Sequence, residues 1–111
     1  MKKFGFSAKF RLSDFKAIRI AFKKKAFYTD GVKLFVCENE LGYNRYLCTF
    51  RRNFATAVKR NSIRRHCREY LRHVNMLLKQ GYDFVFLFND SKVEPVSAKK
   101  SLQVLLEKAG F

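Results

Sequence analysis

Apolar residues recur with helical spacing near the start of the chain. After Leu12, the residues Phe15, Ile18 and Phe22 follow one another at intervals of three or four, which is the period of one face of an α-helix. Ser13 stands directly before them and is a residue type that often caps a helix N-terminus. The pattern predicts a first helix that starts near Leu12.

The middle of the chain has the pattern of short strands. Residues 32–37 and 45–50 are rich in β-branched and aromatic side chains, and residues 38–44 between them contain Gly42 and two Asn. Such a segment predicts a hairpin loop that joins two strands. Strand alternation divides the first of these strands into two faces. One face carries Val32, Leu34 and Val36, and the other carries Lys33, Phe35 and Cys37.

The second half of the chain predicts a long helix, a buried strand and a last helix. The helix covers residues 57–79 and is ended by Gly81, the continuous apolar run 82–88 suits a buried strand, and residues 97–108 form the final helix. The predicted order is α, one or two short strands, β, α, β, α, which gives an α+β or mixed α/β sandwich of one sheet with helices. The sequence shows no linker and no repeat, so a single domain is expected over residues 1–111. The apolar stripe expected to face the core from the long helix is Ile63, Cys67, Tyr70, Leu71, Val74, Leu77 and Leu78.

Arginine dominates the adjacent arc of the long helix. Between Arg60 and Arg72 there are five Arg and no Lys. Like charges four residues apart destabilise a helix slightly, whereas guanidinium groups match phosphate oxygens with paired hydrogen bonds. The alternative is a solvated face that happens to be basic. The predicted phosphate-binding ridge consists of Arg60, Asn61, Arg64, Arg65, Arg68 and Arg72.

Composition narrows the partners of this ridge. The 111 residues carry a formal net charge of +15, yet 48% of them are hydrophobic, which excludes a disordered basic tail. The excess charge lies in residues 1–33 and 45–72, so it predicts a binding surface for a polyanion. Nucleic acid is the first candidate and an anionic membrane the second, although no apolar stretch reaches the roughly 18 residues that a membrane span needs.

The residues of catalytic chemistry are scattered. Nine acidic residues occur singly, the five glycines are isolated, and His66 and His73 have no second pair of ligands at metal-binding spacing. Cys37, Cys48 and Cys67 are an odd number, which favours free thiols in a reducing compartment. The polypeptide is therefore expected to bind and position, with no catalytic residue and no metal site of its own.

A resemblance to a known protein family indicates which polyanion this surface binds. Residues 57–69 resemble the signature helix of the bacterial ribonuclease P protein component family, and the likeness covers about residues 10–108. The residues that carry it in this helix are Ala57, Val58, Arg60, Asn61, Arg64, Arg65, Arg68 and Glu69. Segments 12–15, 50–52, 82–86 and 98–102 resemble the family's first helix, basic loop, central strand and last helix. The chain departs from the family pattern at Leu47, Asn53, Ser62, Asn89 and Asp90.

The resemblance implies a fold and a function. It implies an α+β fold, an α-β sandwich of order αβββαβα like domain 2 of ribosomal small-subunit protein five, with a left-handed βαβ crossover. It also implies a cytoplasmic subunit of ribonuclease P, which removes the 5′ leader of precursor tRNA with chemistry and Mg²⁺ on the catalytic RNA. No membrane and no protein partner is expected. The residues expected to contact the catalytic RNA are Arg51, Arg52, Asn53, Lys59, Arg60, Asn61, Arg64, Arg65 and Arg68.

A cleft for the single-stranded leader follows from the resemblance together with the aromatic residues. Single strands stack on aromatic side chains in basic grooves. Phe15 matches the leader-facing aromatic of the family, Phe35 shares a strand face with Lys33, and Phe50 adjoins the basic loop. Two other classes stay open: a structural, ribosomal-type RNA-binding protein without a role in cleavage, and a DNA-binding module that uses the long helix.

Overall fold

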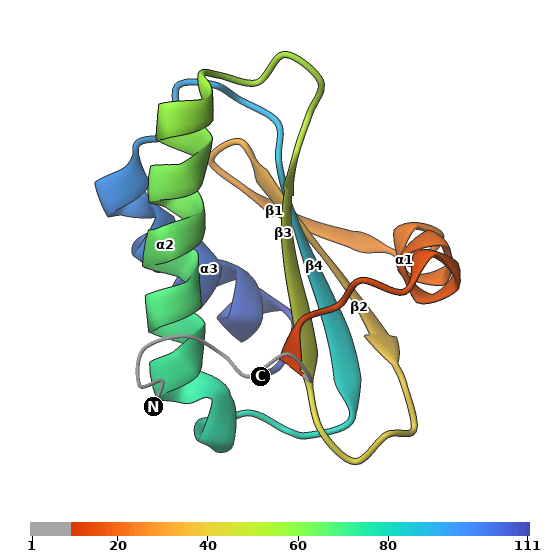
Figure 1. The fold of residues 1–111 in the computed structure, drawn as a ribbon. Helices are drawn as coiled ribbons and strands as arrows, with labels where there is room; N and C mark the ends of the chain where they lie inside the picture. Colours follow the sequence, from red (N-terminus) through yellow and green to blue (C-terminus); the bar gives the residue numbers. More distant parts are fainter. Residues whose placement is uncertain (1–9) are drawn as a thin grey trace, which may run out of the picture.

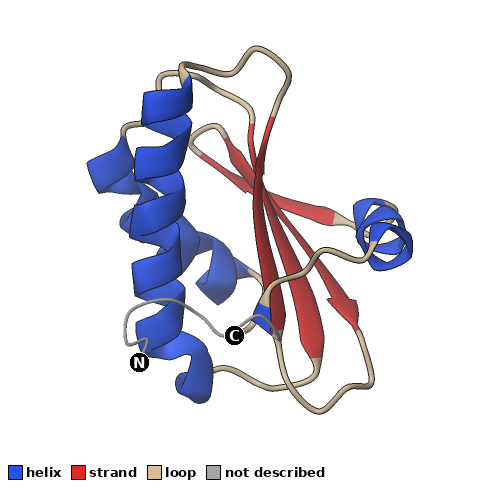
Figure 2. Ribbon diagram, viewed as in Figure 1, coloured by secondary structure: helices blue, strands red, loops and turns tan. Residues whose placement is uncertain are grey.

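A four-stranded sheet separates the helices into two layers. The computed structural model describes residues 10–111, and Figures 1 and 2 show α2 and α3 on one side of the sheet and α1 on the other. The elements in chain order are α1 (Phe15–Phe22), β1 (Ala26–Thr29), β2 (Val32–Glu38), β3 (Arg45–Phe50), α2 (Ala57–Val74), β4 (Tyr82–Phe88) and α3 (Ala98–Lys108). Short 3₁₀ turns, η2 (Asn75–Leu77) and η3 (Pro95–Ser97), precede β4 and α3. This α+β arrangement confirms the predicted order of elements.

The sheet order is β1-β2-β4-β3, so the predicted hairpin between β2 and β3 is wrong. β4 lies between these two strands, antiparallel to β2 and parallel to β3. Its apolar side chains are buried on both faces of the sheet, which requires a central position. Sequence reasoning found the strands and the loop correctly, but loop composition alone does not say which strand pairs with which.

A tight hairpin joins β1 to β2. The turn residues Asp30 and Gly31 both have positive φ, 41° and 82°, as a two-residue turn of the type that matches strand twist requires. A side chain at Gly31 would also meet Asp90, whose Cβ lies 2.5 Å from the position of an added Cβ. Glycine is therefore needed there both for backbone conformation and for space.

Each face of the sheet has its own apolar cluster. The larger cluster lies under α2 and α3 and includes Val32, Leu34 and Phe86, and the smaller one lies under α1 and includes Phe35 and Val85. The predicted division of β2 into two faces is thereby confirmed. The sheet presents one face to the arginine helix and the other to α1.

Asp14, rather than Ser13, caps α1. Its carboxylate accepts a hydrogen bond of 3.0 Å from the backbone N–H of Lys16, which satisfies a free donor at the helix start. Ala21 is buried against the sheet, whereas Phe15 is 79% exposed. The helix thus turns a phenylalanine from the predicted apolar pattern toward solvent.

α2 is shorter than the periodicity predicts. Thr56 caps its start, and Ile63, Cys67 and Leu71 are buried as expected. The helix ends at Val74, and the following 3₁₀ turn leaves Leu77 82% exposed, so its predicted place in the core is wrong. The tighter turn changes the rotation per residue.

α3 and the C-terminus complete the larger core. Leu102, Leu105 and Leu106 are buried, and the ring of Phe111 lies 5.0 Å from that of Phe84. The predicted final helix is confirmed to within one residue. Among the helices of residues 10–111, none combines the length and the apolar character needed to cross a membrane.

Candidate nucleic-acid interface

A tight turn carries the chain from β3 into α2 and exposes basic residues. The backbone N–H of Arg51 donates to Phe88 O at 3.0 Å, and the N–H of Phe54 donates to Arg51 O at 3.0 Å. Asn53 has a φ of 57°, in the left-handed region that Asn tolerates better than most residues. Because the buried ring of Phe54 anchors the turn, Arg51, Arg52 and Asn53 stand in solvent at its rim.

A cavity of about 250 Å³ opens beside this turn. None of its lining residues is acidic, so it concentrates positive charge from three segments of the chain. We call it the turn cavity. It is lined by Thr49, Phe50, Arg51, Arg52, Asn53, Arg60 and Arg64. The structure therefore brings together five of the nine residues predicted to contact RNA.

The arginines of α2 in this cavity are held in place. Arg60 Nη1 donates to the backbone O of Ala55 at 2.6 Å, and Arg64 Nη1 donates to Asn61 Oδ1 at 3.3 Å. The Arg64 guanidinium carbon also lies 5.0 Å from the ring centroid of Phe50, a cation–π contact. These contacts fix the direction of both guanidinium groups and reduce the entropy lost when they bind an anion.

A second cavity of about 240 Å³ lies along the outer edge of β3, the edge that faces away from β4. We call it the β3-edge cavity. Its lining residues are Phe10, Arg11, Leu12, Tyr46, Leu47, Cys48, Arg64, Arg68 and Leu71. Arg64 lines both cavities, and Arg68 follows one helical turn later. The basic face of α2 and the edge of β3 thus form adjoining hollows with a shared arginine wall.

Three predicted contacts, Lys59, Asn61 and Arg65, line neither cavity. Lys59 Nζ donates to the backbone O of Ser91, which ties this side chain to the loop before α3. Arg65 is exposed on α2 and lines neither cavity. Lys59 is therefore separated from the arginine cluster, and Arg65 can reach only an RNA that extends beyond the two cavities.

Two thiols pack beneath the arginine face. Cys67 is fully buried, while Cys37 and Cys48 are half-buried, and all three are free. A hydrogen bond with Cys48, followed by burial, raises the pKa of the Cys67 thiol well above its usual range. Cys67 is therefore a neutral core side chain, and its contact with Cys48 joins α2 to β3 beneath the β3-edge cavity.

On the other face of the sheet, the structure corrects the prediction for Phe35. The side chain of Phe35 is only 8% exposed, and its ring meets that of Phe22 edge-on at 4.9 Å between centroids. It is unavailable as a stacking platform because α1 lies directly on it. Lys33 lies on the same face and is half-buried, and Phe15 is open to solvent at the start of α1.

Phe50 lies on the face opposite to α1, so the structure does not bring it together with Phe15, Lys33 and Phe35. Its ring stacks on that of Phe88 at 5.3 Å between centroids and lies under Arg64. Alternation along β3 places Phe50 with Tyr46 on the α2 side. The sequence shows only that Phe50 adjoins the basic loop, and not which face of the sheet its side chain occupies.

Sequence reasoning missed other residues of both surfaces. Tyr28 is 54% exposed and lies opposite Lys33 in the β1–β2 ladder, and Lys33 in turn lies opposite Leu87 of β4. Delimiting β1 and applying the same two-residue alternation would have found Tyr28. Phe10 and Arg11 line the β3-edge cavity, and only the parallel bridge between Arg11 and Tyr46 reveals this.

Comparisons with known proteins agree on one family. The family described as Ribonuclease P matches residues 6–110. A ribonuclease P protein component from Borrelia duttonii is 39% identical over 94 residues, covering 83% of this chain and 79% of that protein. One from Thermoanaerobacter sp. is 28% identical over 100 residues, covering 82% and 86%.

Solved structures show the same fold. The ribonuclease P protein from Thermotoga maritima, solved in complex with 1-(4-fluorophenyl)-2-thiourea, has a TM-score of 0.77 and 25% identity. The match covers 88% of this chain and 98% of that one. A Staphylococcus aureus ribonuclease P protein mutant has a TM-score of 0.81 at 18% identity, covering 91% and 88%.

Proposed function

We infer the role of this chain from its family, because it belongs to the ribonuclease P protein family. It is the protein component of the endoribonuclease that matures the 5′ end of tRNA, and its partner is the ribonuclease P RNA. Catalysis belongs to that RNA. The task of the polypeptide is therefore binding and positioning.

The observation that carries the RNA-binding proposal is the pair of hollows along α2 and β3. Together they gather Arg51, Arg52, Arg60, Arg64 and Arg68 on one surface. Arginine forks bind phosphate oxygens in pairs, and backbone phosphates dominate the affinity of proteins for nucleic acids. We propose that this surface contacts the catalytic RNA, with Asn53 in the turn cavity and Asn61, Lys59 and Arg65 at the margins.

The proposal assigns Mg²⁺ to the RNA subunit. Within residues 10–111, no three His, Cys, Asp or Glu side chains lie close enough together to hold a metal ion. We therefore propose that the Mg²⁺ ions of the assembly are bound mainly by the RNA. The arginines of the polypeptide instead lower the repulsion between RNA strands, which reduces the concentration of Mg²⁺ that the assembly needs.

The second part of the proposal concerns precursor tRNA. We propose that its single-stranded 5′ leader lies along the α1 face of the sheet, where Phe15 and Tyr28 are exposed and Lys33 supplies a positive charge. Aromatic platforms beside cations are typical of single-strand binding. This site replaces the predicted cleft, since Phe35 and Phe50 are not available to it.

The family resemblance also supports a detailed fold assignment and a cellular location. We propose the ribosomal small-subunit protein five domain 2 likeness and the left-handed β3-α2-β4 crossover from the family resemblance, supported by the parallel pairing of β3 with β4. We also propose that the protein works in the cytoplasm, away from membranes, and that it needs no further protein partner.

Reconstitution tests the function directly. Purified protein is added to the ribonuclease P RNA of the same organism and to precursor tRNA at low Mg²⁺, and release of the 5′ leader is measured. We expect faster cleavage than with RNA alone. A polylysine of similar net charge controls for unspecific screening, and equal stimulation by protein and polylysine would contradict the proposal.

A further inference from the structure

We propose that the β3-edge cavity receives an unpaired nucleobase of the catalytic RNA, whose neighbouring phosphate binds Arg64 and Arg68. The proposal rests on the proposed function and adds a ligand class to it. Phosphate contacts alone give affinity without selecting a particular part of the RNA. A cavity for one base would fix the register of the protein on its RNA.

The size and the walls of the cavity suit a planar ring. Its volume of about 240 Å³ is many times the roughly 10–15 Å³ that a cavity needs to hold one water molecule. Phe10, Leu12 and Leu71 supply apolar surface from the N-terminal segment and from α2. Proteins that recognise RNA bases place them against aromatic and apolar side chains of this kind.

The backbone of β3 supplies polar groups at the floor of the cavity. Leu12 N donates to Tyr46 O at 2.9 Å on the outer edge of β3, and Arg51 N donates to Phe88 O on the inner edge. The backbone N–H and C=O of one strand residue point to the same edge of the strand, and those of the next residue point to the opposite edge. The N–H and C=O of Cys48 therefore face the outer edge of β3, as those of Tyr46 do.

The outer edge of β3 is open at Cys48. β3 is the last strand of the sheet, so no strand lies beyond it among residues 10–111. The bridge that the structure shows on this outer edge joins Arg11 to Tyr46, two residues before Cys48. Within residues 10–111, the N–H and C=O of Cys48 have no strand partner on this side, and such a donor and acceptor side by side match the edge of a base, which presents an acceptor next to a donor. The cavity can therefore bind a base by its edge as well as by its face.

The charge of the rim selects a nucleotide over a peptide or an apolar ligand. Arg11, Arg64 and Arg68 line the cavity, and none of its lining residues is acidic. Arg64 also lines the turn cavity, so its guanidinium group lies between two adjacent phosphate sites. A chain of nucleotides can thus place one base in the β3-edge cavity and continue over the turn.

Base-specific chemical probing of the catalytic RNA tests the proposal. At saturating protein, we expect the protein to shield one or a few unpaired bases from alkylation at their Watson–Crick edges. Phe10→Ala removes an apolar wall and keeps every cation, so it should lose this shielding with an unchanged salt dependence of binding. Arg65→Ala removes a cation outside the cavity, so it should keep the shielding and bind with a weaker salt dependence.

Shielding that survives in Phe10→Ala at saturation, with the variant folded by circular dichroism, would overturn the proposal. Shielding confined to riboses and phosphates in the unsubstituted protein would overturn it as well. Both results would leave stimulation of cleavage intact, so they are distinguishable from a failure of the proposed function, which would abolish that stimulation.

A second measurement needs no catalytic RNA. The protein is titrated separately with the four ribonucleoside 5′-monophosphates and with ribose 5-phosphate, and the amide resonance of Cys48 is followed by nuclear magnetic resonance. We expect it to shift with at least one nucleotide and to stay in place with ribose 5-phosphate. Equal shifts with both, or no shift with any nucleotide, would show that the cavity holds no base.

Discussion

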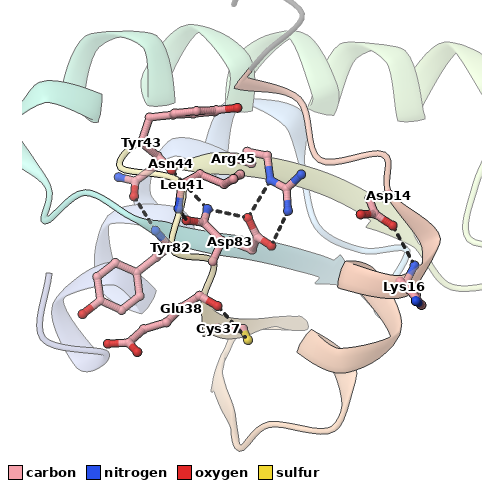
Figure 3. A network of polar contacts seen from close by, with 11 residues as sticks. Asp14, Lys16, Cys37, Glu38, Leu41, Tyr43, Asn44, Arg45, Tyr82 and Asp83 are labelled. Atoms are coloured by element: carbon pink, nitrogen blue, oxygen red, sulfur yellow. Dashed lines mark hydrogen bonds and ion pairs between the residues drawn. The ribbon is translucent and has the colours of Figure 1, made fainter.

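Arg45 and Asp83 form a bidentate ion pair across the parallel strands β3 and β4. Arg45 Nε donates to Asp83 Oδ1 and Nη2 donates to Oδ2, both at 2.9 Å (Figure 3). Asn39 Nδ2 adds a third hydrogen bond of 2.8 Å to Oδ1. The hydrogen bond with Asp83 raises the pKa of Arg45 above its usual value. This network fixes the start of both strands and the loop before β3.

Removing the charge of Asp83 should destabilise the fold strongly. The Asp83 side chain is 3% exposed and that of Arg45 is 17% exposed, so Asp83→Asn leaves a largely desolvated cation without its counter-charge. We expect the free energy of unfolding to fall by about 2–4 kcal/mol, slightly below the roughly 3–5 kcal/mol of a fully buried pair because Arg45 keeps some contact with water. Denaturant unfolding measures the loss.

The exposed pair between Lys99 and Glu69 is the control for this experiment. Its atoms are 3.8 Å apart, and about half of each side chain is in solvent. Lys99→Ala should therefore change the free energy of unfolding by no more than about 1 kcal/mol. Equal losses in Lys99→Ala and Asp83→Asn would mean that burial does not decide the strength of these pairs.

Tyr46 should make the protein less stable at high pH. Burial raises the pKa of Tyr46 to about 12, whereas an unfolded tyrosine titrates near 10. Between these values the unfolded state binds fewer protons than the folded state, so the free energy of unfolding falls as the pH rises. The total loss through this window is about 2–3 kcal/mol.

Tyr46→Phe separates this effect from the titration of other groups. The variant is less stable at neutral pH, because Asn75 Oδ1 loses the hydroxyl that donates to it. It should nevertheless lose less further stability than the unsubstituted protein as the pH is raised from about 9 to about 12. Parallel stability curves for the two proteins would contradict the assignment.

Local patterns predicted the elements well because they depend on neighbouring residues. The bounds of β3 and β4 and the arginine face of α2 all follow from spacing along one segment. The pairing of β3 with β4 does not, since it depends on which strand is the most apolar in the whole chain. Phe50 illustrates the same limit. Its place in the sequence does not show that its side chain lies on the α2 side of the sheet, opposite to the face that carries α1.

Buried polar residues were the least predictable part of the fold. Asp83 interrupts an apolar run, and only the folded chain shows that Arg45 neutralises it. Asn44 is fully buried and accepts a hydrogen bond from Tyr82 N at 2.9 Å while its amide donates to Lys79 O. Such residues look like loop residues in the sequence because their partners lie more than thirty positions away.

Replacing Arg64 by Lys should separate charge from geometry at the interface. Lysine keeps the positive charge but loses the paired donors and the planar contact with Phe50. We expect Arg64→Lys to bind the catalytic RNA more weakly with an unchanged dependence on salt. Arg64→Ala should bind more weakly still, with a salt dependence reduced by about one phosphate contact. Filter binding at several salt concentrations measures both, and full affinity in Arg64→Lys would show that charge alone suffices.

Phe35→Ala should reduce stability because the structure places this ring in the core beneath α1. Truncation of a buried phenylalanine leaves a cavity and typically costs about 3–5 kcal/mol. Thermal unfolding would show the loss directly. A stable variant with weakened binding of the leader would instead restore Phe35 to the leader site.

Phe15→Ala should affect leader recognition without affecting the fold. The ring is 79% exposed, so its removal takes little surface out of the core. If a base of the leader stacks on it, the variant should bind precursor tRNA more weakly by about 1–3 kcal/mol, the range for one lost stacking contact. Mature tRNA, which lacks the leader, should bind the holoenzyme as before.

The matched control is Ile20→Ala on the same helix. Ile20 is 49% exposed and lies about 140° around the helix from Phe15, so it removes exposed apolar surface at a different place. We expect this variant to keep the preference for precursor over mature tRNA. Because both substrates share the tRNA body, only a contact with the leader can change their ratio. An equal loss of affinity for both substrates in Phe15→Ala would therefore place the leader elsewhere on the protein.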